Sequence, residues 1–269
     1  MYLTLLHINA GNQPGRQWLG NLYRVHQRLW MAFPDQKQRI DDPYFLAPWD
    51  GPPLPESKPP RKEAGFLFRL ERDGPARILV QSAQRPDWEY AFQNAPYLLA
   101  CSAKVREFNP TPRRGERYRF RLLAHVVDRQ TVAREQTRTT RSGKTIAKRR
   151  RKETWVLPAP VPATLPTDAK ERQRLLSARW DSWRDWLNRL GGRAGFQVLD
   201  EPATPLLVQA VRSFVRDPEN QKAMRYNGGL FDGMLRVEDP DAARDAITRG
   251  IGPAKAFGFG LLSIAPVRE

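Results

Sequence analysis

The chain has 269 residues, of which 45 are Lys or Arg and 29 are Asp or Glu, so its formal net charge is +16. It contains no run of about 18 apolar residues, and its first residues lack the pattern of a signal peptide, which predicts a cytoplasmic protein without a membrane anchor. The single cysteine, Cys101, excludes an internal disulfide, and His7, His26 and His125 form no zinc-binding pattern with it. We therefore expect no metal or other cofactor, and the positive charge favours nucleic acid as the partner.

The first part of the chain predicts a βαββαβ order of elements. Apolar alternation and turn residues indicate strands, and apolar spacings of three and four indicate helices. The expected elements are a strand over 2–8, a helix over 16–33, a hairpin of strands 66–70 and 77–81 around Asp73-Gly74, a short helix over 87–94 and a strand over 103–108. A proline-rich stretch over 34–62 is expected to be a long connection, and we assign it no function.

After a break over 109–115 the same order of elements can be traced again. The expected elements are a strand over 116–127, a helix over 168–190, strands within 196–237, a helix over 239–249 and a closing strand over 258–264. Two consecutive βαββαβ sets predict an α+β fold of two tandem ferredoxin-like domains. We place these domains at residues 1–112 and 113–269.

The first predicted helix carries a tyrosine and a histidine, Tyr23 and His26, three residues apart at the edge of its buried stripe. Both side chains should therefore lie together beside a groove. A histidine titrates near neutral pH and suits general acid-base catalysis, and a neighbouring tyrosine hydroxyl can position or stabilise a charged group. An ordinary surface pair would show the same spacing, so the pattern alone leaves both interpretations open.

A cationic run occupies 134–152, with Ser142-Gly143 at its centre. Two extended arms joined at a turn would form a hairpin that carries its charges into an RNA groove. The cations predicted to contact RNA are Arg138, Arg141, Lys144, Lys148, Arg149, Arg150 and Arg151. A solvated loop is the alternative interpretation, which the net charge makes less favoured.

The segment 250–262 contains four glycines and one lysine: Gly250, Gly252, Gly258, Gly260 and Lys255. Glycines allow positive φ and a close backbone approach, and successive N–H groups in such turns can bind a phosphate, to which a lysine adds charge. The alternative is a helix cap at Gly250 followed by a tight turn. The spacing matches neither a P-loop nor a dinucleotide-binding fingerprint.

Several of these segments, in the same order, resemble one known family. They are Met1–Leu3, Leu22–Trp30, Phe33–Pro34, Val80–Gln84 and Gly250–Leu262. The family is CasE, the CRISPR-associated endoribonucleases of the type I-E Cascade complex. The resemblance implies a tandem ferredoxin-like protein that binds the stem-loop of a CRISPR repeat, cuts the precursor RNA without metal and keeps the product as a Cascade subunit.

The resemblance also implies roles for individual residues. His26 and Tyr23 match the catalytic pair of the family, and residues 250–260 match its glycine-rich loop. Some members have a lysine where this chain has Met31, so another cation would have to assist at the scissile phosphate. Arg28, which we also predict to contact RNA, and Lys255 are the two candidates, and the sequence does not choose between them.

Two other functions compete with repeat cleavage. A non-catalytic RNA-binding subunit would use the same basic surface and leave His26 and Tyr23 without a role. A general basic protein that coats DNA or acidic membranes would explain neither this pair nor the glycine-rich segment.

Overall fold

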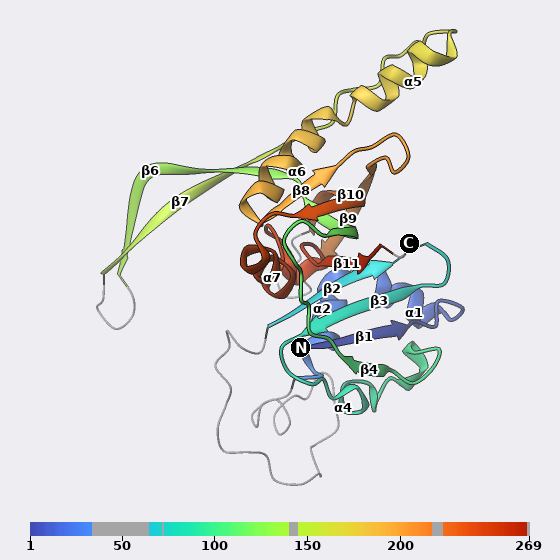
Figure 1. The fold of residues 1–269 in the computed structure, drawn as a ribbon. Helices are drawn as coiled ribbons and strands as arrows, with labels where there is room; N and C mark the ends of the chain where they lie inside the picture. Colours follow the sequence, from blue (N-terminus) through green and yellow to red (C-terminus); the bar gives the residue numbers. More distant parts are fainter. Residues whose placement is uncertain (34–64, 72, 140–144, 217–222, 268–269) are drawn as a thin grey trace. The chain divides into compact units, whose positions relative to one another are not determined.

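The computed structural model describes residues 1–33, 65–71, 73–139, 145–216 and 223–267 (Figure 1). The chain forms two compact units. The first unit comprises residues 1–125 and 191–269, and the second comprises residues 126–190. The predicted proline-rich connection over 34–62 lies outside the described residues.

The N-terminal sheet belongs to the first unit and contains four antiparallel strands in the order β2-β3-β1-β4. The strands are β1 (Tyr2–His7), β2 (Phe66–Glu71), β3 (Arg77–Ser82) and β4 (Lys104–Glu107). The helices between them are α1 (Gln13–Leu19), α2 (Leu22–Trp30), α4 (Trp88–Phe92) and the 3-10 turn η1 (Pro96–Leu98). The hairpin around Gly74 is as predicted, and Gly74 takes the positive φ that its turn requires.

One predicted helix is wrong in its extent. The segment expected to be a single helix over 16–33 consists of α1 and α2, which are separated at Gly20 and Asn21. Asn21 has an extended backbone, and its side chain accepts a hydrogen bond from Tyr23 N at 3.1 Å, which starts a new helix. The predicted apolar stripe of α2 is confirmed, because Leu22, Val25 and Leu29 are all buried in the N-terminal core.

The C-terminal sheet, also in the first unit, has the order β11-β5-β10-β8, with β9 paired to β10. The strands are β5 (Arg117–His125), β8 (Phe196–Leu199), β9 (Leu207–Arg216), β10 (Ala223–Val237) and β11 (Leu262–Pro266). Helix α7 (Pro240–Arg249) joins β10 to the glycine-rich segment, which contains the 3-10 turn η2 (Lys255–Phe257). The closing strand begins at Leu262, later than predicted, because residues 258–261 belong to the loop.

The two sheets share one arrangement of strands. In the N-terminal sheet β1 lies between β3 and β4, and β2 follows beyond β3. In the C-terminal sheet, with β9 set aside, β5 lies between β10 and β11, and β8 follows beyond β10. Every pairing between these strands is antiparallel. This is the order of a split βαβ unit, and it confirms the predicted α+β class. The division into domains at residue 112 stays a prediction.

The second unit contains the β6–β7 hairpin, helix α5 and most of helix α6. The strands β6 (Val127–Thr139) and β7 (Thr145–Trp155) pair in antiparallel register. The helix predicted over 168–190 is two helices, α5 (Ala169–Ala178) and α6 (Asp181–Arg193), separated at Arg179 and Trp180. No helix within the described ranges is long and apolar enough to cross a membrane.

Candidate active site

Helix α2 carries both residues of the predicted pair, Tyr23 and His26, one turn apart. The Asn21 cap fixes where this helix begins, and three buried side chains hold one face of it against the N-terminal core. Tyr23 is half-buried and packs at the margin of that core. The two side chains are therefore held by a short, capped helix and not by a loop.

The imidazole of His26 lies among aromatic rings. Its centroid is 5.2 Å from that of Phe66, with the two planes stacked at 25°, and 6.3 Å and 6.0 Å from those of Phe68 and Trp30. Its Nδ1 is buried and has no hydrogen-bond partner in the described part of the chain. This desolvation lowers the pKa of His26 from 6.5 to about 4. The ring is consequently neutral at pH 7 and able to accept a proton.

The glycine-rich segment has the backbone geometry that its composition predicts. Gly250, Gly252, Gly258 and Gly260 all have positive φ, and so does Ala254. A Cβ on Gly250 would lie 2.7 Å from a methyl of Leu67, and one on Gly260 would lie 2.3 Å from the oxygen of Ile251. A Cβ on Gly252 would meet nothing within 4 Å. Part of the loop is therefore tightly packed, while Gly252 is open on the outside.

The alternative interpretation of Gly250 as a helix cap is also correct, since α7 ends at Arg249 and Gly250 follows as its cap. Lys255 lies a few residues further along the loop, and its Nζ donates to the Arg249 oxygen at 2.6 Å. The same segment thus closes α7 and then folds back. Its end is fixed by Gly260, whose N–H donates to Leu123 O at 2.7 Å.

Phe68 joins the loop to the histidine. A Cβ on Gly258 would lie 3.2 Å from the ring of Phe68, and the same ring faces His26. Turn η2 of the loop also contacts α2 and β2. The fold therefore brings Tyr23, His26 and the predicted glycine-rich loop to one place within the first unit, although the loop follows the helix by more than 200 residues.

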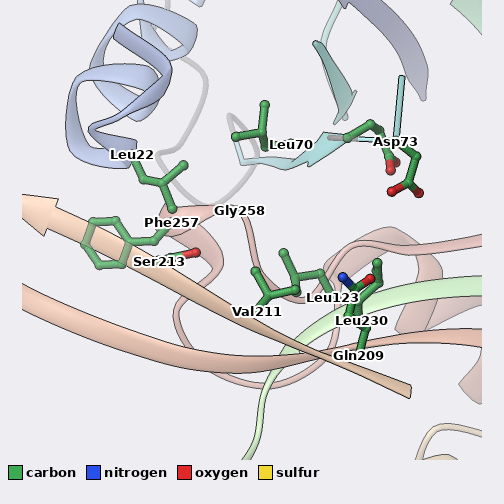
Figure 2. Close-up of a pocket in the computed structure, with 11 residues that line it drawn as sticks. Leu22, Leu70, Asp73, Leu123, Gln209, Val211, Ser213, Leu230, Phe257 and Gly258 are labelled. Carbon is green, nitrogen blue, oxygen red and sulfur yellow. The ribbon is translucent and has the colours of Figure 1, made fainter. Parts of the chain in front are cut away.

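A small cavity of about 90 Å³ lies beside this place. In Figure 2, Leu22 and Leu70 approach it from the N-terminal half, while Leu123 and Val211 line it from the C-terminal sheet. Pockets that hold a ligand of nucleotide size measure roughly 300 Å³ or more. This cavity is too small for a nucleotide and does not by itself provide a binding site for one.

The two candidate substitutes for the missing lysine have different surroundings. Met31 itself is buried. Arg28 donates from Nη1 to Ala91 O at 3.0 Å and to Asn94 Oδ1 at 2.8 Å, which directs it to the end of α4. Lys255 lies in η2, the turn that contacts α2. Of the two, Lys255 belongs to the segment that packs beside the helix of His26.

The cationic run forms the predicted hairpin, since β6 pairs with β7 on either side of residues 140–144. Arg138 lies opposite Ile146, Lys148 opposite Gln136, and Arg149 opposite Glu135. Arg150 and Arg151 lie opposite Val132 and Thr131. Arg141 and Lys144 fall outside the described residues. Contact of these cations with RNA stays a prediction.

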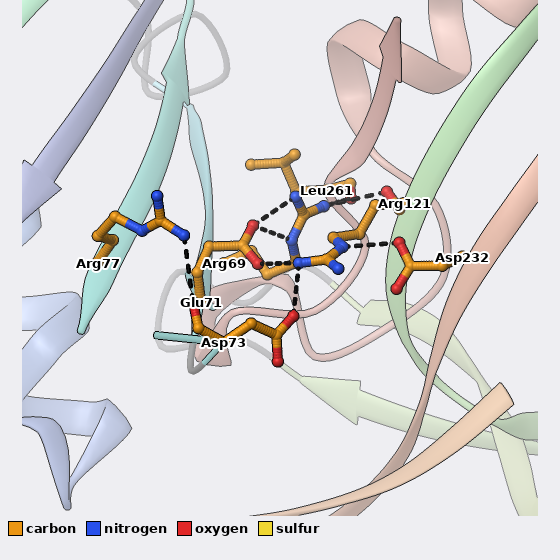
Figure 3. A network of polar contacts seen from close by, with 7 residues as sticks. All are labelled: Arg69, Glu71, Asp73, Arg77, Arg121, Asp232 and Leu261. Atoms are coloured by element: carbon orange, nitrogen blue, oxygen red, sulfur yellow. Dashed lines mark hydrogen bonds and ion pairs between the residues drawn. The ribbon is translucent and has the colours of Figure 1, made fainter. Parts of the chain in front are cut away.

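A partly buried ion network was not predicted from the sequence (Figure 3). Arg69, only 3% exposed, pairs with Glu71, and Arg121 reaches Glu71, Asp73 and Asp232. The bond to Asp232 raises the pKa of Arg121, and burial lowers the pKa of Arg69. The strand sequence Phe-Leu-Phe-Arg-Leu-Glu, with charges inside an apolar run, was the available signal. The burial of nearly every residue of β2 shows that both faces of this strand are covered.

The other histidines and the cysteine form no metal site. Within the ranges that the structure describes, no group of three or more His, Cys, Asp or Glu residues could hold a metal ion. His125 is buried, and its Nδ1 lies 2.7 Å from Asn227 O. Cys101 is free and exposed.

The family model described as "CRISPR associated protein" matches residues 1–266 of this chain. The chain belongs to this family of CRISPR-associated proteins. Two relatives match over nearly their whole length. The CRISPR-associated endoribonuclease Cse3 of Thermus thermophilus is 26% identical over 272 residues, covering 99% of this chain and 100% of the relative. The Cascade subunit CasE of Escherichia coli is 27% identical over 270 residues, with the same coverage.

Solved structures of CRISPR-associated proteins support the same membership. Thermus thermophilus Cse3 bound to an RNA that represents a pre-cleavage complex is 25% identical to this chain, with a TM-score of 0.59. The similarity covers 98% of both chains. The whole of this CRISPR-associated protein, and not one half of it, thus has the fold of an RNA-bound relative.

Proposed function

We propose that this protein is an endoribonuclease that cleaves the repeat stem-loop of precursor CRISPR RNA. The observation that carries the proposal is the meeting of His26 and Tyr23 on α2 with the glycine-rich loop of residues 250–260. The full-length similarity to an endoribonuclease and to a Cascade subunit supports it. Such processing would take place in the cytoplasm, where the transcript is made.

The reaction we propose is a metal-independent transesterification. The ribose 2′-oxygen attacks the adjacent phosphorus and loses its proton to a base, while the bond from phosphorus to the 5′-oxygen breaks. The leaving oxygen takes up a proton, and the products carry a 2′,3′-cyclic phosphate and a 5′-hydroxyl. One group must therefore accept a proton and another must supply one, and each positioned group of this kind typically contributes about 10² to 10⁴-fold.

His26 suits the role of base. Its ring is neutral at pH 7 because the aromatic rings around it lower its pKa to about 4. Tyr23, one turn earlier on the same helix, is then the residue that positions the reacting group or supports the leaving oxygen. Lys255 and the N–H groups near Gly252 are the proposed contacts to the phosphate. Arg28 and the cations of the β6–β7 hairpin, Arg138, Arg141, Lys144 and Lys148 to Arg151, would hold the flanking RNA.

After cleavage we propose that the protein keeps the product and joins other Cascade subunits. The alternative is a non-catalytic RNA-binding subunit, which would use the same hairpin and loop. The distinction lies in whether His26 takes part in a reaction.

The test uses a repeat RNA and its analogue with a 2′-deoxy nucleotide at the cleavage position, both incubated in excess chelator. We expect cleavage of the unmodified RNA only, with a cyclic phosphate detected by mass spectrometry. His26→Ala should lower the rate by at least about 10²-fold with little change in RNA affinity. His7→Ala, at another half-buried histidine, is the matched control and should cleave normally. Tight binding without cleavage of either RNA would support the binding subunit instead.

A further inference from the structure

The buried guanidinium of Arg69 makes contacts with both halves of the first unit. On its own strand, Nε and Nη2 lie 2.7 Å and 2.6 Å from Oε1 of Glu71. On the C-terminal side, Nη1 donates to Arg121 O at 3.0 Å and to Leu261 O at 3.1 Å (Figure 3). One planar group thus uses its fixed fork of donors to join β2 to the backbone of β5 and to the residue before β11.

Leu261 is the residue at which the glycine-rich loop ends. The preceding Gly260 donates to Leu123 O at 2.7 Å and accepts from Ile251 N at 2.8 Å. The bond to Ile251 joins the two ends of the loop, and the bond to Leu123 joins the loop to β5. Arg69 adds a buried side-chain hydrogen bond that joins this end of the loop to β2.

Three successive residues of β2 contact the glycine-rich loop. Leu67 fills the space beside Gly250, Phe68 lies against Gly258, and Arg69 holds Leu261. Phe68 also faces the ring of His26, with centroids 6.3 Å apart. A shift of the loop along β2 would therefore change its position relative to His26.

We propose that Arg69 is a positioning residue for cleavage, which fixes the glycine-rich loop, and the phosphate it binds, at the correct distance from His26. Arg69 touches no substrate and acts through the loop. This inference rests on the proposed function, because it assumes that the loop binds the scissile phosphate. Stability alone is a weak reason to retain the Arg69–Glu71 ion pair, because buried ion pairs add little net stability.

The main test is the substitution Arg69→Lys, measured in single-turnover cleavage at saturating repeat RNA. Lysine keeps the charge, but its three N–H donors share one nitrogen and do not reproduce the fixed fork with which Arg69 reaches Glu71 and both carbonyls. We expect the rate constant to fall on the order of 10²-fold, the loss typical of a reacting group displaced by about 1 Å. The concentration of RNA that half-saturates the enzyme should change less than about threefold.

The matched control is Arg117→Lys. Arg117 lies on β5, the strand that also carries the Arg121 carbonyl contacted by Arg69, but it is exposed and pairs with Glu201. It should change neither parameter. All assays are run well below the unfolding temperature of each variant, which is measured by circular dichroism.

A double-mutant cycle with His26→Ala separates positioning from mere stability. If Arg69 acts by aligning the loop with His26, then Arg69→Lys should cost less than about threefold in the His26→Ala background. The same 10²-fold loss in both backgrounds would overturn the proposal. An Arg69→Lys enzyme that cleaves at the wild-type rate would overturn it too.

Failure of the proposed function gives a different result, because then the wild-type protein does not cleave repeat RNA. If Arg69→Lys does not fold, Glu71→Gln replaces it. That substitution keeps Arg69 but removes the charge that orients two of its nitrogens. A lower rate constant at unchanged half-saturation would support the inference, and an unchanged rate constant would refute it.

Discussion

The protonation state of His26 leads to a quantitative prediction about the pH dependence of cleavage. The surrounding rings hold the pKa of this residue at about 4 in the free protein, against an ordinary value of 6.5. Lowering the pKa of a base makes it neutral over a wider range of pH. The value of kcat/KM reports the ionisation of the free enzyme, so its acid limb should lie near pH 4 and not near 6.5.

The size of the effect follows from these two values. At pH 5 a base with a pKa of 4 is about 90% neutral, whereas one with a pKa of 6.5 is about 3% neutral, a difference of about 30-fold. Wild-type kcat/KM at pH 5 should therefore stay close to its value at pH 7. Replacing the stacked ring by Phe66→Asn admits water, raises the pKa of His26 towards 6.5 and should lower kcat/KM at pH 5 by up to about 30-fold.

The assay is cleavage of repeat RNA at concentrations far below half-saturation, from pH 4 to pH 8 at constant ionic strength. His26→Ala serves as the control and should lack the acid limb altogether. If wild-type kcat/KM instead falls twofold near pH 6.5, the ring is not desolvated in solution. If it rises as the pH is lowered through 5, His26 acts as the acid, and its assignment as the base is wrong.

Two further predictions concern the RNA contacts. Gly250→Ala and Gly252→Ala both place a Cβ at positive φ. Only the Cβ of Gly250→Ala would lie under 3 Å from Leu67 and Gly260. In thermal unfolding, Gly250→Ala should therefore lower the free energy of unfolding by about 1 to 3 kcal/mol more than Gly252→Ala does. Gly252→Ala should keep the fold and weaken RNA binding, and unchanged affinity would exclude Gly252 as a phosphate contact. Replacing Lys148, Arg149, Arg150 and Arg151 by Gln should reduce the slope of log affinity against log salt by about 3, at roughly 0.7 to 0.9 for each neutralised phosphate. An unchanged slope would remove the hairpin from the interface.

Local pattern was enough to predict most elements of the fold. The hairpin of β2 and β3 was visible because short apolar runs flank Asp73-Gly74, and α7 was visible between Asp239 and Gly250. The break before α2 was missed, although its signal was present. Gly20 and Asn21 together mark the end of one helix and the cap of the next, while the apolar spacing runs through both without a change.

The environment of the candidate site could not be predicted in the same way. The spacing of Tyr23 and His26 predicted their shared helix face, but two of the three rings around His26 come from β2, far along the chain. Likewise, the composition of residues 250–260 predicted positive φ, whereas the partner of that loop depends on how the two sheets pack. The role of Arg69 arises from tertiary contact alone, since its bond to Leu261 spans 192 residues.

That long separation bears on how the protein is made. A ribosome synthesises the N-terminal sheet early and, at about 5 to 20 residues per second, completes residues 250–261 only many seconds later. Until then the apolar side chains of Leu67 and Phe68 lack their eventual cover, and the nascent chain exposes this strand to the crowded cell. Any activity that requires the glycine-rich loop beside His26 must therefore await synthesis of the C-terminal sheet.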